Sequence, residues 1–318
     1  MQLIEKRQKS AFVGETFKGL SFWTYNVYMV MINGRGSVES ISLVLLTGML
    51  YNLMKFREIV TENDENPYFY DLSLKNFIKS EGDKHLLKAA LFYSGLVTFR
   101  LYPILYGFSV VLFIQRGKWM PTNSTIKFFI ISAGLFVFLF GLSYALYGNL
   151  FVYEWALYHL VRKDPRHSQS VFWMRQMYNM VNGDKIPINL ITLVFRLGTI
   201  VWVSFKFRSN IVLAIFINTL IFTVFNTVYT AQYAIWEIQL LPLLFKQTTL
   251  WTKSKLKFFF VMVFWLLTME LSIIYGGMYE NGGKNTLYKM HISNIVYVFY
   301  RIFVVKFVLD NRIPYLDY

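Results

Sequence analysis

Two long stretches of the chain carry no charged side chain, and this feature restricts the fold more than any other. The first covers residues 128–153 and is 26 residues long; the second covers residues 209–236 and is 28 residues long. About 20 apolar residues are enough for an α-helix to cross the hydrocarbon core of a bilayer. Both stretches are continuously apolar rather than alternating, which does not suit the strands of a membrane barrel. The sequence therefore predicts an all-α, polytopic transmembrane helical bundle.

Seven hydrophobic segments are predicted, at residues 38–54, 86–114, 128–160, 186–205, 209–244, 258–279 and 287–309. Lys and Arg are concentrated in alternate loops, which assigns those loops to the cytoplasm. The basic N-terminus fits that side if residues 12–32 add an eighth passage or half-passage, which we favour, or if one of the seven segments is miscounted. We thus expect seven to eight membrane segments, with a basic leader and an interfacial or re-entrant segment in residues 1–37, a transmembrane domain in 38–310 and a short tail in 311–318.

Some of these segments are longer than one bilayer crossing requires. The second and third exceed the hydrocarbon thickness, so tilting, a break or an interfacial extension is expected in each. Pro103 predicts a kink in the second segment, and Pro242 is expected to end or bend the fifth.

The residues that several classes of function require are missing from the sequence. The formal net charge is +14, but the basic residues lie mostly in loops and at segment ends, which favours anionic lipid over nucleic acid as their partner. The chain has no cysteine and four histidines, none in the H-x-x-H or H-x-x-x-H spacing of a di-metal centre. A phosphate-binding loop and a recognisable nucleophile motif are absent. We predict no enzyme activity, no catalytic residue, no cofactor and no metal site.

Charged residues inside apolar segments are the positive evidence for function. Arg100, Arg196 and Glu270 each interrupt a membrane-length stretch. A charge at bilayer depth costs roughly 3 kcal/mol on insertion scales, so it normally faces protein or a wet groove. The three are interpreted as a polar path, with structural pairing as the alternative. For the charges nearer segment ends we expect structural pairing or snorkelling: Glu154, Glu237, Arg301 and Lys306.

Two amides join the predicted path. Asn218 and Asn226 belong to a series of amide and hydroxyl side chains along the fifth segment, which is treated as one helix. Such side chains either bond between helices or line a groove for polar headgroups, and the sequence leaves both open. Separately, Asn123 begins the sequon Asn123-Ser124-Thr125 in a loop assigned to the outside, so it is a glycosylation candidate.

The order of features resembles the XK-related family of phospholipid scramblases. The residues that carry the resemblance are Phe99-Arg100-Leu101-Tyr102, Ser143–Asn149, Phe195-Arg196, Ile211–Phe216 and Glu270. The resemblance covers roughly residues 86–310. It implies a helical protein that moves phospholipids in both directions down their gradient without ATP.

We therefore predict a scramblase-like protein in which Arg100 and Arg196 attract lipid phosphate and Glu270 balances charge or meets an amine headgroup. A headgroup that crosses hydrocarbon unaided faces the same desolvation cost as a buried charge. The expected partners are membrane phospholipids and a membrane-protein subunit, with no nucleic acid. The alternatives are a ligand-sensing receptor, a small-solute transporter or a membrane-protein assembly factor. The plasma membrane is favoured over the endoplasmic reticulum.

Overall fold

The computed structural model describes residues 39–62, 78, 80–116, 118–158, 169–183, 188–230, 232–245, 247–250 and 255–313. Every regular element in these ranges is a helix, and one isolated antiparallel bridge joins Thr248 and Arg312. The all-α prediction is confirmed. The predicted leader, with its interfacial or re-entrant segment, lies outside the described residues.

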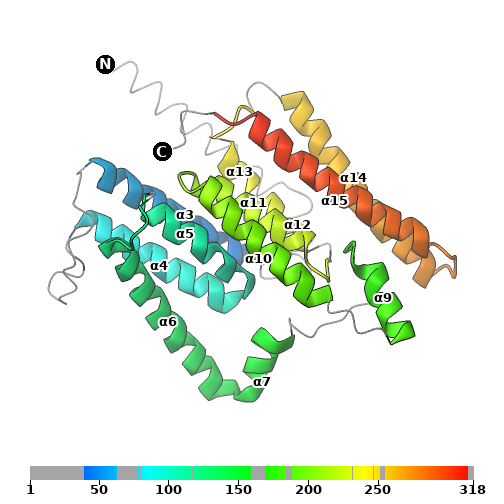
Figure 1. Ribbon diagram of the computed structural model, residues 1–318, viewed down its shortest axis with the longest axis horizontal. Coiled ribbons are helices and arrows are strands. Elements are labelled where there is room, and N and C mark those ends of the chain that lie inside the picture. The colour runs from blue at the N-terminus through cyan, green and yellow to red at the C-terminus, as the bar shows by residue number, and fades with distance from the viewer. Residues whose placement is uncertain are drawn as a thin grey trace. The chain divides into compact units, whose positions relative to one another are not determined.

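The helices follow one another along the chain as α3 (Glu39–Glu62), α4 (Glu81–Phe99), η2 (Tyr102–Tyr106), α5 (Gly107–Ile114), α6 (Asn123–Tyr147), α7 (Asn149–Val152), η3 (Tyr153–Leu157), α9 (Trp173–Asn182), α10 (Ile188–Lys206), α11 (Ile211–Val224), α12 (Tyr233–Ile238), α13 (Leu241–Leu244), α14 (Lys255–Glu280) and α15 (Leu287–Asp310) (Figure 1). By length and composition, three of the described helices can cross a membrane: α6, α14 and α15. The described helices thus include three candidate spans, and the predicted seven to eight segments are not confirmed.

Three predicted segments are broken, each for a local reason. The second breaks at Arg100, whose backbone is extended, and the chain restarts as η2 with Pro103 in its first turn. A proline is tolerated there because the first turn needs no N–H donor. The third segment breaks at Gly148, whose φ of 59° favours glycine. The fifth is not one helix: residues 225–230 are irregular between α11 and α12.

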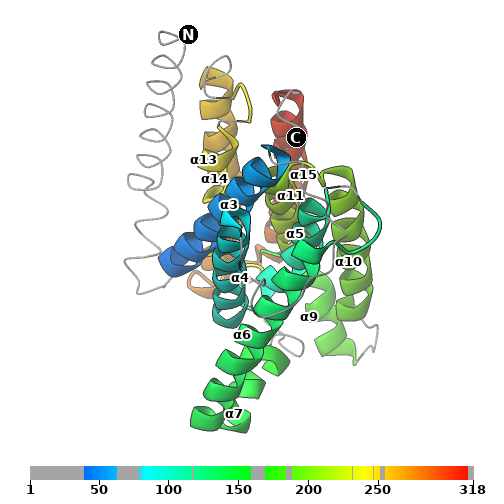
Figure 2. The same cartoon turned by 90° about the vertical axis from the view of Figure 1, so that its left-hand side faces the viewer.

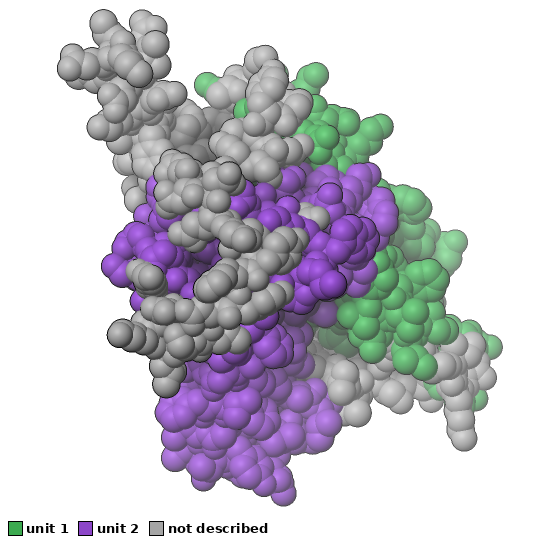
Figure 3. Space-filling model, turned by 60° about the vertical axis from the view of Figure 1, so that its left-hand side comes forward, with its two compact units in different colours: residues 1–36, 163–199, 219–318 green, residues 37–162, 200–218 purple. Residues whose placement is uncertain are grey.

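The chain divides into two compact units (Figure 3). Unit 2 comprises residues 37–162 and 200–218. In it α3 and α4 lie side by side (Figures 1 and 2) and run antiparallel, since the His85 Nδ1 and Asn52 Oδ1 atoms are 2.9 Å apart while Gly48 faces the Phe92 ring. A Cβ on Gly48 would lie 2.8 Å from that ring, so any larger residue there would force the ring to move.

Within unit 2 the break at Gly148 returns the chain along α6. The Phe140 ring lies 5.2 Å from Phe151 and 5.5 Å from Trp155. Trp155 also donates its indole N–H to the Thr98 carbonyl, in the last turn of α4, at 2.9 Å. The overlong third segment is thus explained by a reversal rather than by tilt.

Unit 1 comprises residues 1–36, 163–199 and 219–318, and its described core contains the antiparallel pair α14 and α15 (Figure 1). Hydrogen bonds join the two helices along their length: Trp265 to Tyr297 at 3.2 Å and Tyr300 to the Val261 carbonyl at 2.7 Å. This pair forms one side of the candidate site.

Candidate functional site

Residues 225–230, between α11 and α12, form an irregular backbone stretch in the apolar part of unit 1. An unwound stretch leaves carbonyls without helical partners, which in a membrane protein must be satisfied by other protein groups or by water. Three carbonyls of this stretch accept hydrogen bonds from residues just before α9 or inside it. Ser170 Oγ donates to Asn226 O at 2.7 Å, Gln176 Nε2 to Thr227 O at 2.8 Å, and Gln169 N to Tyr229 O at 2.8 Å. These three hydrogen bonds therefore stabilise the irregular backbone.

Hydrogen bonds tie this stretch to α14 and α15. We call the groups that make them the Ser170 junction: the carbonyls of Asn226 and Tyr229 and the side chains of Gln169, Ser170, Ser272 and Asn294. Ser272 Oγ donates to Asn294 Oδ1 at 2.5 Å, and Asn294 Nδ2 donates to Ser170 O at 3.1 Å. Gln169 Nε2 donates to Met269 O at 3.1 Å. Four of these side chains are buried, and the junction brings together residues up to 124 positions apart in the sequence.

Next to the junction lies a buried ion pair, and we call its surroundings the Arg301 cluster: Thr223, Tyr229, Glu237, Tyr297 and Arg301. Arg301 donates to Glu237 Oε1 and to Thr223 Oγ1, and Thr223 donates to the same carboxylate oxygen. Arg301 is 2% exposed and Glu237 is 0% exposed. Two charges buried this deeply are tolerated because each neutralises the other and both are hydrogen-bonded.

Aromatic rings complete the Arg301 cluster. The guanidinium carbon lies 4.9 Å from the Tyr229 ring centre and 5.1 Å from that of Tyr297, within range of a cation–π attraction. The two tyrosine hydroxyls are 2.9 Å apart. Because the Tyr229 carbonyl also accepts from Gln169, the cluster and the junction share one residue of the unwound stretch. The ion pair thereby helps to fix the polar backbone.

Two predicted site residues flank the junction. Glu270 follows Met269, whose carbonyl accepts a hydrogen bond from Gln169. The carbonyl of Asn226 accepts a hydrogen bond from Ser170. Both side chains are half-buried and make no hydrogen bond or ion pair with the described residues. Arg196 lies on α10 with its guanidinium carbon 5.1 Å from the Phe222 ring centre and its Nε buried without a hydrogen-bond partner. Unit 1 thus holds three of the five path candidates.

The other two path candidates lie in unit 2 with partners of their own. Arg100 donates to Glu39 at 2.5 Å, at the break between α4 and η2. Asn218 Nδ2 donates to Ser109 Oγ at 2.8 Å and to Ser204 Oγ at 3.1 Å, while its Oδ1 is buried without a partner. These contacts favour packing over a path. In the described part of the chain, no three His, Asp or Glu side chains gather as metal ligands would.

The glycosylation candidate Asn123 is the first residue of α6. The Thr125 hydroxyl of its sequon is buried and lies 2.9 Å from that of Thr122, the residue that caps this helix. Glycosylation of Asn123 stays a prediction.

Comparison with known proteins decides the family. Residues 32–309 match the model of the family described as Mannosyltransferase (PIG-M). The chain belongs to this family. Relatives with matching names include the following three. GPI mannosyltransferase 1 of Dictyostelium discoideum is 23% identical over 326 residues, which cover 92% of this chain and 67% of that protein.

The other two relatives are similar to the same extent. GPI mannosyltransferase 1 of Saccharomyces cerevisiae is 27% identical over 310 residues, covering 92% of this chain and 69% of the relative. The Danio rerio protein named GPI alpha-1,4-mannosyltransferase I, catalytic subunit, is 24% identical over 310 residues, covering 95% of this chain and 71% of the relative. The chain spans about two thirds of each.

Membership of the PIG-M mannosyltransferase family corrects four predictions. The resemblance to the XK-related scramblases is wrong, because short aromatic and aliphatic runs are what any lipid-facing helix requires. Scrambling is wrong, and so are the receptor, transporter and assembly-factor alternatives. The prediction that the chain is not an enzyme is wrong as well, because the family is one of mannosyltransferases. The absence of metal, nucleotide and nucleophile motifs therefore did not exclude an enzyme. A plasma-membrane location is not supported.

Sequence reasoning also missed the Ser170 junction and the sharing of Tyr229. The available signal was the density of amides and hydroxyls at residues 226–232 inside an apolar segment. In a single helix these side chains would point to several faces. In an irregular stretch the backbone carbonyls need hydrogen-bond donors, and only the folded structure shows which residues supply them.

Proposed function

We propose that this chain is a membrane glycosyltransferase that adds mannose to a growing glycosylphosphatidylinositol. The observation that carries the proposal is the match of residues 32–309 to the mannosyltransferase family, which includes nearly all the described residues. The names of the Dictyostelium discoideum and Saccharomyces cerevisiae relatives support the same substrate, and that of the Danio rerio relative supports an α-1,4 linkage.

The Ser170 junction suits a lipid-anchored sugar substrate. Irregular backbone at membrane depth is tolerated where it is buried in protein or lines a water-filled cavity. A substrate whose sugar sits on a membrane lipid has to be met by a polar surface close to the membrane. An unwound stretch held between two spans offers such a surface, and its fixed position limits how the bound sugar can turn.

We assign Glu270 and Asn226 to sugar binding. A carboxylate accepts hydrogen bonds and an amide both donates and accepts, so the pair matches the hydroxyls of a sugar. Both side chains flank the junction and have no hydrogen-bond partner among the described residues. Arg196 is assigned to a phosphate of the lipid-linked substrate, since a guanidinium binds phosphate through paired N–H groups. Arg100 and Asn218 are assigned to packing within unit 2.

We further propose that the enzyme works in the endoplasmic reticulum, where such mannosyltransferases are typically found. The words "catalytic subunit" in the name of the Danio rerio relative support a second membrane-protein subunit for this chain as well.

The test is transfer by membranes from a host that lacks its own enzyme of this kind. The membranes receive a radiolabelled mannose donor and a glycosylphosphatidylinositol acceptor that lacks mannose. We expect a radiolabelled lipid to form, and treatment with α-mannosidase should release its label. The Saccharomyces cerevisiae relative, expressed in the same host, is the positive control. If the relative produces the labelled lipid and this chain, present at equal level with the partner subunit supplied, produces none, the proposed function is wrong.

A further inference from the structure

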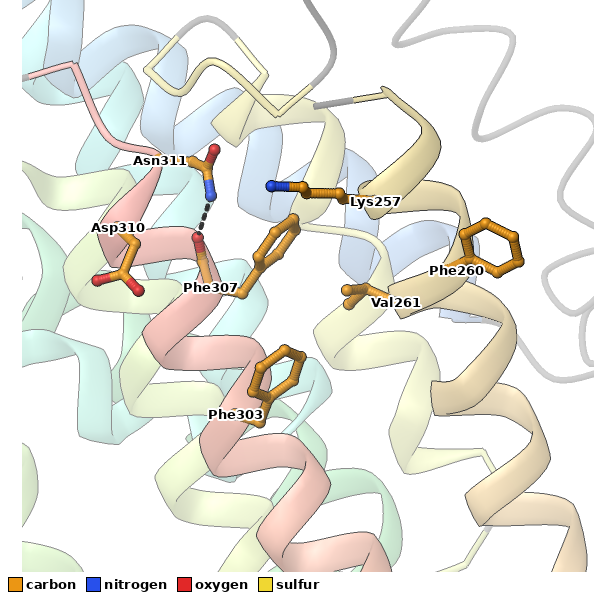
Figure 4. Close-up of a pocket in the computed structure, with 7 residues that line it drawn as sticks. All are labelled: Lys257, Phe260, Val261, Phe303, Phe307, Asp310 and Asn311. Atoms are coloured by element: carbon orange, nitrogen blue, oxygen red, sulfur yellow. Dashed lines mark hydrogen bonds between the residues drawn. The ribbon is translucent and has the colours of Figure 1, made fainter. Parts of the chain in front are cut away.

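A groove of about 490 Å³ lies between the beginning of α14 and the end of α15, within unit 1 (Figure 4). Its lining residues come from these two helices and from the position that follows α15: Lys257, Phe260, Val261, Phe303, Phe307, Asp310 and Asn311. The groove is distinct from the Ser170 junction, which is attached to α14 at Met269 and Ser272.

The groove is polar at one end and apolar along the rest of its length. Lys257 lies in the first turn of α14, and Asp310 is the last residue of α15. Figure 4 shows Lys257 reaching from α14 toward Asn311, with the Phe307 and Phe303 rings further along α15. Those two rings are stacked, 6.3 Å apart. Because both helices are candidate membrane spans, the polar end lies at the depth of lipid headgroups and the rings lie at the depth of acyl chains.

The charges at the polar end are not satisfied by the described residues. Neither Lys257 nor Asp310 makes a hydrogen bond or ion pair with any of them. The first turn of α14 contains no acidic residue, and the last turn of α15 contains no basic one. A helix N-terminus favours an anion and a C-terminus favours a cation. The start of α14 and Lys257 therefore both attract an anion. The end of α15 and Asp310 both attract a cation.

We propose that this groove binds a zwitterionic glycerophospholipid. Its phosphate contacts Lys257 at the start of α14, its ammonium contacts Asp310 at the end of α15, and one acyl chain lies against Phe303 and Phe307. Asp310 disfavours a lipid with a net negative headgroup, and the exposed Phe303 ring favours an amphiphile over a free phosphate. The site needs no sugar and goes beyond the proposed transfer reaction.

Lipid retention tests the site directly. The purified full-length protein is equilibrated with equal amounts of phosphatidylethanolamine and phosphatidylglycerol, and the lipids that remain bound are counted by native mass spectrometry. We expect phosphatidylethanolamine to be retained preferentially. Lys257→Gln removes a charged hydrogen bond and is expected to lower that retention about tenfold. The matched control is Lys255→Gln, two residues earlier on the same helix and outside the groove, which is expected to retain lipid as the unaltered protein does.

Asp310→Asn sharpens the test, since loss of the carboxylate is expected to remove the preference for phosphatidylethanolamine over phosphatidylglycerol. Equal retention by Lys257→Gln and the unaltered protein overturns the proposal, and so does an equal loss in Lys255→Gln. Thermal unfolding confirms that each variant is folded. Mannose transfer is measured in the same samples, so failure of the lipid site and failure of the proposed function give different results.

Discussion

An arginine–glutamate pair occurs in each unit, and the two pairs have different surroundings. Arg100 meets Glu39 at a helix break, and its side chain is 32% exposed. Arg301 meets Glu237 from within the continuous helix α15, and its side chain is 2% exposed. In the sequence Arg100 stands in the middle of its apolar segment and Arg301 nearer an end. Position along a segment is therefore a poor measure of burial; helix breaks and neighbouring elements decide it.

The contrast also explains what each pair can do. The Arg100 pair ties the start of α3 to the end of α4, where the extended backbone of Arg100 interrupts the helix. The Arg301 pair lies against Tyr229 of the unwound stretch. Structural pairing or snorkelling was the expectation for Glu237 and Arg301, and their contact shows pairing. Arg100 was interpreted as part of a polar path, with pairing as the alternative, and in the structure it contacts Glu39.

The largest effect on stability is expected from Arg301→Leu. It leaves the Glu237 carboxylate buried without its countercharge, which costs about 3 to 5 kcal/mol. Thermal unfolding of the purified protein measures the loss. Lys306→Leu, at an exposed position on the same helix, is the control and should change stability by less than about 0.5 kcal/mol.

A double variant keeps this prediction informative if the single variant fails to fold. Glu237→Leu combined with Arg301→Leu removes both charges and should recover most of the lost stability, because a well-packed apolar pair often replaces a buried ion pair without cost. A double variant as unstable as Arg301→Leu alone would contradict the importance of the pair.

A smaller effect is expected from Arg100→Leu. Glu39 is 0% exposed and loses a charged hydrogen bond worth about 1.5 to 3 kcal/mol, but the half-exposed position of Arg100 lets water replace part of it. The same unfolding measurement should place this loss below that of Arg301→Leu. If Arg100→Leu loses as much stability as Arg301→Leu or more, exposure at the helix break does not reduce the contribution of the Arg100–Glu39 pair.

The smallest effect on stability is expected from Glu270→Gln, because Glu270 has no partner among the described residues that the change would orphan. Stability should change by less than about 0.5 kcal/mol, as for a typical surface substitution. Mannose transfer should fall about tenfold or more, as expected when a charged hydrogen bond to a substrate is lost. Full transfer activity in Glu270→Gln would remove this residue from the proposed sugar site.

Part of the site was predictable and part was not. Glu270 and Asn226 stood out as polar groups in apolar segments, and both lie beside the Ser170 junction. Gln169 and Ser170 did not stand out, because their role depends on the carbonyls of residues some 56 to 60 positions away along the chain. Hydropathy reports the environment of a segment but not which distant backbone it will meet.

The sequence by itself determined that this protein is helical and that some of its helices are long and apolar enough to cross a membrane. It also located α14 and α15 to within a few residues: segments 258–279 and 287–309 became Lys255–Glu280 and Leu287–Asp310. Only the tertiary structure decided where the other segments break and which charges pair. An unwound stretch or a buried charge is stable only when particular partners reach it, and residues far apart in the chain supply those partners once the helices have packed.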